Sequence, residues 1–387
     1  MDLNFRDDVS TFTGSNKVWE QNKDQFYDYA HQQTIGRSLT CQWVDDFSLE
    51  GNDDQYLILG EDHEKKYELS IYRVDLGKGS QNQSPFKKVF KESLGSEAHH
   101  ARHQPGNPHV IAAIQESGNI IMIHSDYTNK YSDGQRNTIV TNGHTCEGYG
   151  LSWNPKNTNQ LLTAAYDSKI FLWDVAESRT QLQKVQTFDD HTKEVEDVEW
   201  SPFHYNMFGS VSDDKTLKFF DTRSKKSCLI DIIAHSEEIN SLSFNPFNSN
   251  ILITGSSDNL ASLWDLRNPK KRMHSFISHS KPVYKVCFNK KQENIFATSS
   301  DDKKIIFWDI SKIGEEQIGR DSDIGPPEMI FTHTGHKKLI RDIYWYPYEK
   351  WAMVSVDDNY INQVWKVKPE ILEYNPEIEF LQILEQF

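Results

Sequence analysis

The stretch HSEEINSLSFNPFNSNILITGSSDNLASLWD, residues 235–265, decides the fold of this 387-residue chain. Two short runs within it, ILIT at 251–254 and ASLW at 261–264, have the β-branched and aromatic composition of strands. The residues SDN at 257–259 lie between these runs and predict a tight turn. The quoted stretch therefore predicts consecutive antiparallel strands joined by short turns.

The side chains of this stretch keep a fixed spacing. His235 precedes Phe244 by nine residues, Phe244 precedes Asp258 by fourteen, and Asp258 precedes Trp264 by six. This spacing occurs five times without insertion or deletion, with the histidines His144, His191, His235, His279 and His336, the turn residues Asp167, Asp214, Asp258, Asp302 and Asn359, and the final aromatics Trp173, Phe220, Trp264, Trp308 and Trp365. Such a unit is typical of WD repeats, and we interpret these side chains as a structural frame in which the Asp bonds backbone N–H groups and the His of its own repeat.

Two further repeats lie upstream in degenerate form. One keeps the spacing through Leu94, His103, Ser117 and Ile123 but has lost every characteristic side chain, and residues 38–75 supply the other. The sequence thus predicts an all-β fold, a seven-bladed WD-repeat β-propeller over residues 38–367.

Three segments lie outside the regular repeats. Residues 1–37 are predicted to form an N-terminal arm with an amphipathic helix over 16–34, and residues 368–387 a C-terminal helix. Residues 311–334 are an inserted loop that contains Pro326-Pro327 and is expected to project from the rim.

The composition excludes several functional classes. The formal net charge of −15 argues against direct nucleic-acid binding and favours a basic partner. No run of apolar residues is long enough to span a membrane, and the first 30 residues have no signal-peptide core. The four cysteines form no CxxC pair, which fits reduced thiols in a nuclear protein, or one that is also cytoplasmic.

The sequence carries no motif for catalysis. We find no P-loop, nucleophile elbow, zinc-protease helix or dinucleotide-binding loop, so we expect a protein that is not an enzyme and needs no cofactor. The histidines at 99, 100, 103 and 109 are interpreted as part of a degenerate blade, and no metal site is predicted.

The residues at the start of each repeat predict an acidic, aromatic mouth at one end of the propeller axis. Positions three and five after the repeat histidine are two apart on the entering strand, so we expect them to face the same way. Carboxylates there would bind Arg or Lys, and aromatic rings would hold the aliphatic stems or cationic heads of those side chains. These positions hold Glu97, Glu147, Glu194, Glu238, Pro282 and Leu339, and then His99, Tyr149, Glu196, Asn240, Tyr284 and Arg341. The alternative is an ordinary ring of solvated loops.

An arginine follows the WD dipeptide in Trp264-Asp265-x-Arg267, and Phe220-Asp221-x-Arg223 repeats the pattern. Each arginine either caps its blade or resembles the docking box of WD-repeat substrate receptors of cullin-type ubiquitin ligases.

Several segments together resemble one family. They are EGYGLSWNP (147–155), FGSV (208–211), DTRS (221–224), LSFNP (242–246), WDLRN (264–268), HSF (274–276), and SKIGEEQ with GPPE (311–328). On these segments the chain resembles, over about residues 16–367, the retinoblastoma-binding, Msi-type histone-binding WD-repeat proteins. It departs from them at Pro282, where an acidic residue is usual, and at His99, where Asn is usual.

The resemblance implies two protein-binding surfaces. The mouth would bind the tail of histone three or basic cofactor peptides through Glu97, His99, Glu147, Tyr149, Glu196, Glu238, Asn240, Tyr284, Arg341 and Asp358. A side groove would bind the first helix of histone four through Trp19, Phe26, Tyr29, Asp321, Asp323, Pro326 and Pro327.

The expected function is that of a histone-binding chaperone or scaffold. Its partners would be core histones and the subunits of chromatin assembly, remodelling, deacetylase, acetyltransferase or Polycomb-type complexes. Two alternatives stay open at this point, a substrate receptor of a cullin-type ligase and a generic WD-repeat scaffold without histone affinity.

Overall fold

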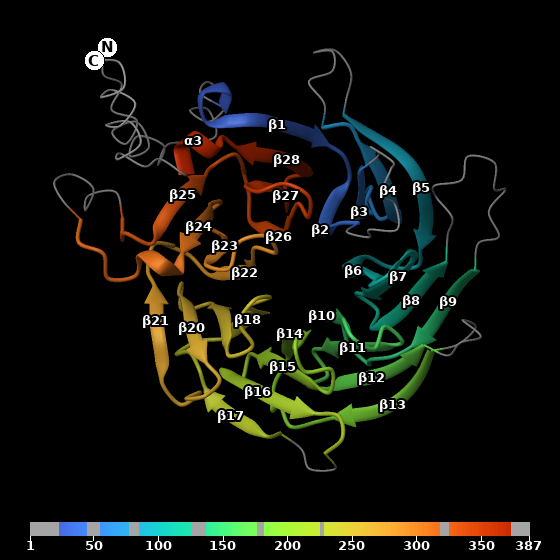
Figure 1. Cartoon of the computed structure of the whole chain (residues 1–387). Coiled ribbons are helices and arrows are strands. Elements are labelled where there is room, and N and C mark those ends of the chain that lie inside the picture. Colours follow the sequence, from blue (N-terminus) through green and yellow to red (C-terminus); the bar gives the residue numbers. More distant parts are fainter. Residues whose placement is uncertain are drawn as a thin grey trace, which may run out of the picture.

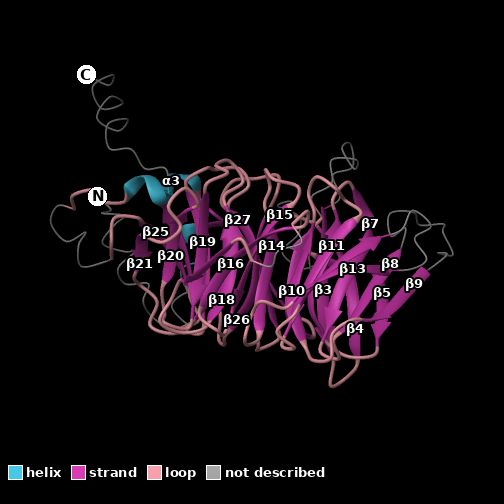
Figure 2. Cartoon of the chain, turned by 90° about the horizontal axis from the view of Figure 1, so that it is seen from below, coloured by secondary structure: helices cyan, strands magenta, loops and turns pink. Residues whose placement is uncertain are grey.

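The chain forms a ring of seven β-sheets around a central axis (Figure 1). The structure is a computed structural model that describes residues 23–44, 55–76, 85–124, 137–175, 182–224, 228–317 and 325–372. Each sheet in these ranges has four antiparallel strands, and in side view the sheets stand between two layers of loops (Figure 2). The predicted all-β, seven-bladed propeller is confirmed.

Within each blade the first strand lies next to the axis and the last lies on the outside of the ring. Blade 1 is β2 (Arg37–Trp43), β3 (Gln55–Asp62), β4 (Tyr67–Val74) and β5 (Phe86–Leu94); blade 2 is β6 (Ala98–Gln104), β7 (Asn107–Gln115), β8 (Asn119–His124) and β9 (Asn137–Asn142); blade 3 is β10 (Gly148–Trp153), β11 (Gln160–Ala165), β12 (Ile170–Val175) and β13 (Leu182–Phe188); blade 4 is β14 (Val195–Trp200), β15 (Met207–Ser212), β16 (Thr216–Asp221) and β17 (Ile230–Ile233). Blade 5 is β18 (Ile239–Phe244), β19 (Ile251–Ser256), β20 (Ala261–Asp265) and β21 (Arg272–Phe276); blade 6 is β22 (Val283–Phe288), β23 (Ile295–Ser300), β24 (Ile305–Asp309) and β25 (Met329–His333); blade 7 is β26 (Ile340–Trp345), β27 (Ala352–Asp357), β28 (Ile361–Val367) and β1 (Tyr27–Thr34).

The N-terminal segment closes the ring as a strand. β1 pairs antiparallel with β28, so residues from both ends of the propeller complete blade 7 (Figure 1). The predicted helix over 16–34 is therefore wrong for 27–34. The edge of β28 offers a row of backbone groups that only a strand can pair, and this pairing overrides the local helical spacing. Residues 23–26 are helical, and 16–22 lie outside the described residues.

Few other helical residues occur in the described ranges. The segment after blade 7 forms a short helix, α3 (Pro369–Leu372), and the rest of the predicted C-terminal helix lies outside them. A 3₁₀ turn, η3 (Ile310–Lys312), begins the inserted loop, whose residues 318–324 are also outside. No helix in the described part of the chain is both long and apolar enough to cross a membrane.

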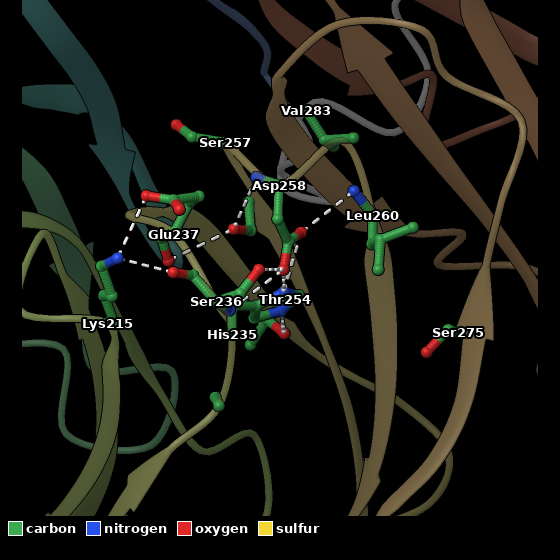
Figure 3. Close-up of polar contacts among 12 residues, drawn as sticks. Lys215, His235, Ser236, Glu237, Thr254, Ser257, Asp258, Leu260, Ser275 and Val283 are labelled. Carbon is green, nitrogen blue, oxygen red and sulfur yellow. Dashed lines mark hydrogen bonds and ion pairs between the residues drawn. The ribbon is translucent and has the colours of Figure 1, made fainter.

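The predicted frame ties each regular blade together, as blade 5 illustrates (Figure 3). His235 Nδ1 lies 3.0 Å from a carboxylate oxygen of Asp258, and Ser236 N–H donates to the same carboxylate (3.2 Å). On its other side, His235 Nε2 lies 2.7 Å from Thr254 Oγ1, which accepts the Trp264 indole N–H at 2.9 Å. Burial lowers the pKa of His235, so its imidazole is neutral near pH 7. Since Nδ1 then carries the proton that the carboxylate accepts, Nε2 accepts from the Thr254 hydroxyl.

The sequence interpretation missed the hydroxyl group of this chain of hydrogen bonds. It lies nineteen residues after each repeat histidine, at Thr163, Ser210, Thr254, Thr298 and Ser355. Blade 7 brings a second correction, because His336 pairs with Asp357 (3.1 Å) and not with Asn359. Asn359 N–H donates to Asp357 instead, at 2.8 Å.

Candidate functional site

A β-bulge in every inner strand shapes the mouth of the propeller. In each blade the register shifts by one residue at position five after the repeat histidine, or at its counterpart in blades 1 and 2. A bulge turns two successive residues toward one face. Positions five and six therefore line the axis together, whereas simple alternation predicted positions three and five.

The bulge residues form what we call the rim ring. It consists of Leu39, His99, Tyr149, Glu196, Asn240, Tyr284 and Arg341. The next position forms the middle ring, which consists of Thr40, His100, Gly150, Asp197, Ser241, Lys285 and Asp342. The two rings stack along the axis, with the rim ring nearer the mouth.

Several residues of the middle ring make hydrogen bonds and ion pairs that join the blades. Asp342 accepts from Cys41 N–H of the next inner strand (2.9 Å) and pairs with Arg102 at 3.1 Å. Asp197 accepts from the Ser241 hydroxyl (2.9 Å) and pairs with Lys285 at 3.0 Å. These buried carboxylates and cations thus satisfy one another, as buried charges must.

A cavity of about 310 Å³ lies between the rim ring and the middle ring. Its walls come from the rim ring, the middle ring, the turns that join the second and third strands of the blades, and the loop that enters blade 5. The lining residues are Leu39, His99, His100, Tyr149, Tyr166, Glu196, Asp197, Asp213, Glu238, Asn240, Ser257, Tyr284, Lys285, Arg341 and Asp342. This size is at the lower end for a ligand pocket and accommodates one long side chain.

Seven of the ten predicted mouth residues line this cavity, namely His99, Tyr149, Glu196, Glu238, Asn240, Tyr284 and Arg341. The other three lie outside its lining. Glu97 is held by Arg37 in a two-pronged contact at 2.5 and 2.7 Å, and burial outweighs this cation and raises the pKa of Glu97. Glu147 accepts from Tyr149 Oη at 3.4 Å, and Asp358 pairs with Arg341 at 2.9 Å.

The sequence interpretation missed the residues that the strand-joining turns contribute. Tyr166, Asp213 and Ser257 occupy position 22 after the repeat histidine, and all three line the cavity. The backbone N–H at this position donates to the carbonyl of position three in its own blade, as Asp213 does to Glu194 at 3.0 Å. Because this position is the same in each repeat, the repeat spacing could have predicted that these residues reach the cavity.

The acidic side of the cavity is electrostatically unusual. Burial, followed by the charge of Asp213, raises the pKa of Glu196 to about 8. Burial, together with Glu194 and Glu238, raises the pKa of Asp213 to about 6. Among the described residues, no cation makes an ion pair with Glu196, Asp213 or Glu238. The cavity consequently offers excess carboxyl groups that an incoming cation would satisfy.

Aromatic rings form the wall next to these carboxyl groups. His99 stacks on Tyr149 with ring centroids 4.2 Å apart, and Tyr149 leans on Tyr166 at 5.3 Å. Burial lowers the pKa of His99 to about 4, so its ring is neutral near pH 7. Neutral rings beside carboxyl groups suit the stem and head of a cationic side chain.

The predicted side groove is not assembled by the described residues. Phe26 is 5% exposed and packs in the core between blades 6 and 7, so it is not available as an anchor. Tyr29 is half-buried against a different cluster, which includes Tyr346. Pro326 and Pro327 are half-buried in the inserted loop. Trp19, Asp321 and Asp323 lie outside the described residues.

Comparison with known protein families agrees with this architecture. Residues 146–365, more than half of the chain, match the family described as nucleolar protein 10-like, N-terminal domain, which is a β-propeller. The match covers the regular blades and includes the rim residues from Tyr149 to Arg341. The chain therefore belongs to the nucleolar protein 10-like, N-terminal domain family of WD-type β-propellers.

Proposed function

We propose that this chain is a non-enzymatic, histone-binding scaffold whose axial mouth takes a basic tail. The observation that carries this proposal is the axial cavity, in which tyrosines lie on both sides of Glu196, Asp213 and Glu238. The most fitting occupant is the tail of histone three, presented within chromatin assembly, remodelling, deacetylase, acetyltransferase or Polycomb-type complexes.

The chemistry of the mouth supports a cationic, extended ligand. A carboxyl group with no cation beside it gains most from an incoming Arg or Lys, because that ligand supplies the missing counter-charge and hydrogen-bond donors. A net charge of −15 also attracts a basic partner from a distance. The cavity is narrow, so an extended peptide would rest on the rim and insert one side chain.

Two resemblances in sequence support the nuclear setting. The segments shared with the Msi-type proteins, above all SKIGEEQ and GPPE, favour histone binding over a generic scaffold. The family matched by residues 146–365 takes its name from a nucleolar protein, which favours a nuclear location. The side groove stays outside the proposal, since Phe26 is buried in the core.

A matched pair of charge reversals tests the mouth. Glu238 and Glu237 are neighbours on one loop, but Glu238 lines the cavity whereas Glu237 pairs with Lys215 in solvent (3.0 Å). Glu238→Lys should weaken binding of a histone-three tail peptide at least tenfold, because like charges across an interface cost several kcal/mol. Glu237→Lys should change the affinity much less.

Isothermal titration calorimetry of both variants decides between specific and diffuse attraction. Equal losses would show that only the overall negative field attracts the peptide. The absence of binding by the wild type, or of any core histone in a pulldown, would overturn the proposed function. The association rate should also fall as salt shortens the Debye length below about 8 Å.

The second candidate function is that of a substrate receptor of a cullin-type ubiquitin ligase. Two exposed arginines at the end of the propeller opposite the mouth favour it. Arg223 and Arg267 are each held by the Asp two residues earlier (2.6 Å), and their side chains are 70% and 71% exposed. Exposed aromatics, Phe203, Tyr205 and Phe247, follow inner strands of the same blades. Co-purification of the cullin-ligase adaptor that is lost with Arg267→Ala would support this role.

A further inference from the structure

The floor of the axial cavity carries a buried nitrogen atom that has no polar partner among the described residues. His100 is 7% exposed and lines the cavity from the middle ring. Its Nδ1 lies 2.8 Å from the carbonyl oxygen of Tyr149, and a carbonyl only accepts, so Nδ1 carries the proton. Burial lowers the pKa of His100 well below its usual value. Nε2 is therefore an acceptor, and no described residue donates to it.

A pair of carboxyl groups from different elements lies in the cavity wall. Glu196 comes from inner strand β14 and Asp213 from the turn between β15 and β16, and both line the same small cavity, beside Tyr166. Burial and the charge of Asp213 raise the pKa of Glu196 to about 8, so Glu196 holds a proton near pH 7.

The surroundings of this pair are mostly acidic. The carboxyl groups that face it are Glu194 from the preceding loop, Asp197 from β14 and Glu238 from blade 5, and the tyrosines are Tyr149, Tyr166 and Tyr284. Lys193 acts on Asp213 from the loop before β14. The cations that line the cavity are already engaged, Lys285 of the middle ring by Asp197 and Arg341 of the rim ring by Asp358.

We propose that one guanidinium or ammonium side chain enters the axial cavity, donates a hydrogen bond to Nε2 of His100, and displaces the proton that Glu196 holds beside Asp213. The cation replaces the proton as counter-charge, and the proton passes to the buffer. The mouth is thus a cation–proton exchange site. This inference rests on the proposed function only in that the same basic tail supplies the side chain.

This exchange of a proton for a cation determines whether the affinity for the ligand rises or falls with pH. The free site holds the proton until the pH passes the pKa of Glu196, about 8. Binding requires its release, so affinity should rise with pH between about 6 and 8. One released proton corresponds to at most about a tenfold gain in affinity per pH unit. Above pH 8 the dependence should level off.

The first experiment measures the released proton directly. Calorimetry of the full chain with a histone-three tail peptide at pH 7, in phosphate and in Tris, should show about one proton released per bound peptide. Glu196→Gln should abolish this release and flatten the pH dependence, and Asp213→Asn should do the same if Glu196→Gln does not fold. Glu237→Gln, outside the cavity, is the control and should behave as the wild type.

A second set of variants tests the acceptor at the floor. His100→Leu removes Nε2 and should weaken the peptide at least fivefold. His100→Gln keeps both a donor and an acceptor and should restore most of the affinity. If His100→Leu and His100→Gln weaken binding equally, Nε2 is not the acceptor and that part of the proposal is wrong.

Small cations separate this inference from the proposed function. Methylguanidinium and methylammonium should each release a proton on binding, and their relative affinities identify the preferred head group. Peptide binding without proton release would overturn the exchange and leave the proposed function intact. Proton release by the small cations without peptide binding would do the opposite. Failure of every cation to bind would overturn both.

Discussion

Blades 3 to 7 and blade 1 hold their strands together with different polar groups. In the regular blades a histidine links an aspartate to a hydroxyl, as His235 does between Asp258 and Thr254. In blade 1 a single carboxylate takes over: Glu61 accepts from the Tyr72 hydroxyl (2.6 Å) and the Lys88 ammonium (2.6 Å). The strand register places Tyr72 where the regular blades have the WD tryptophan.

Blade 2 dispenses with such groups. Its counterparts of the hydroxyl and the tryptophan are Ala113 and Ile123, both fully buried. Blades of all three kinds adopt the same four-stranded structure. We infer that packing between blades defines the fold, whereas the polar groups that join the strands within a blade can be replaced. Substitutions should nevertheless lower the free energy of unfolding most where these polar groups include a buried charge, because removing one partner leaves the other buried without a hydrogen bond.

The largest effect is expected in blade 1. Glu61→Ala should lower the free energy of unfolding by about 3–4 kcal/mol, since it leaves the buried hydroxyl groups of Ser70 and Tyr72 without their acceptor and Lys88 with only its longer contact to Glu68. Urea unfolding followed by tryptophan fluorescence measures this loss. Glu68→Ala is the matched control, because Glu68 also contacts Lys88 (3.3 Å) but is partly exposed. Equal losses in the two variants would contradict the special role of Glu61.

The next effect concerns the irregular turn of blade 7. Asp357 is fully buried and accepts from His336 and from the backbone N–H groups of Lys337, Asn359 and Ile361. Asp357→Ala should cost about 1.5–3 kcal/mol, the usual range for hydrogen bonds to a charged group. Asn359→Ala should cost clearly less. If Asn359→Ala lowers the melting temperature more than Asp357→Ala does, Asn359 is the residue that completes the frame of blade 7.

That turn also shows where sequence reasoning is reliable. Residue type and spacing predicted the histidines, the aspartates and the rim positions, because each WD repeat imposes the same local geometry. Asn359 was chosen by spacing alone, whereas the structure uses a carboxylate two residues earlier. The hydroxyl groups, such as Thr254, were missed because serine and threonine are common on strands and carry no distinctive signal.

The site was partly predictable for the same reason. Tyr149 and Glu196 were predicted because rim positions recur, but the bulge that turns His100 and Asp197 toward the axis leaves no mark in one sequence. Asp213 reaches the cavity from another turn, which a strand-by-strand interpretation does not connect. The segment 27–34 was misassigned because its helical spacing is real, and only the free edge of β28 makes it a strand.

A smaller effect concerns acid sensitivity of the histidine–aspartate contact in the regular blades. Burial would raise the pKa of Asp258, but the hydrogen bond from His235 and two backbone N–H groups lower it to about 2, against about 3.9 when unfolded. The contribution of Asp258 to the free energy of unfolding is thus complete above pH 4 and disappears as the pH falls through 2. After allowance for solvent screening, Asp258→Asn should cost about 1 kcal/mol at pH 7. In urea unfolding, the difference from the wild type should narrow below pH 4.

The smallest effect is expected at the exposed Asp265–Arg267 pair of blade 5. Its guanidinium makes two contacts with the carboxylate (2.6 and 3.0 Å), yet the side chain of Arg267 is 71% exposed and solvent screens the pair. Arg267→Ala should therefore leave the melting temperature unchanged, and Arg223→Ala, with the same local pair, should match it. A fall beyond replicate scatter in calorimetric scans would show that this pair caps the blade. An unchanged melting temperature makes Arg267→Ala a clean probe of partner docking, because any loss of adaptor binding then reflects the missing guanidinium and not a weakened blade.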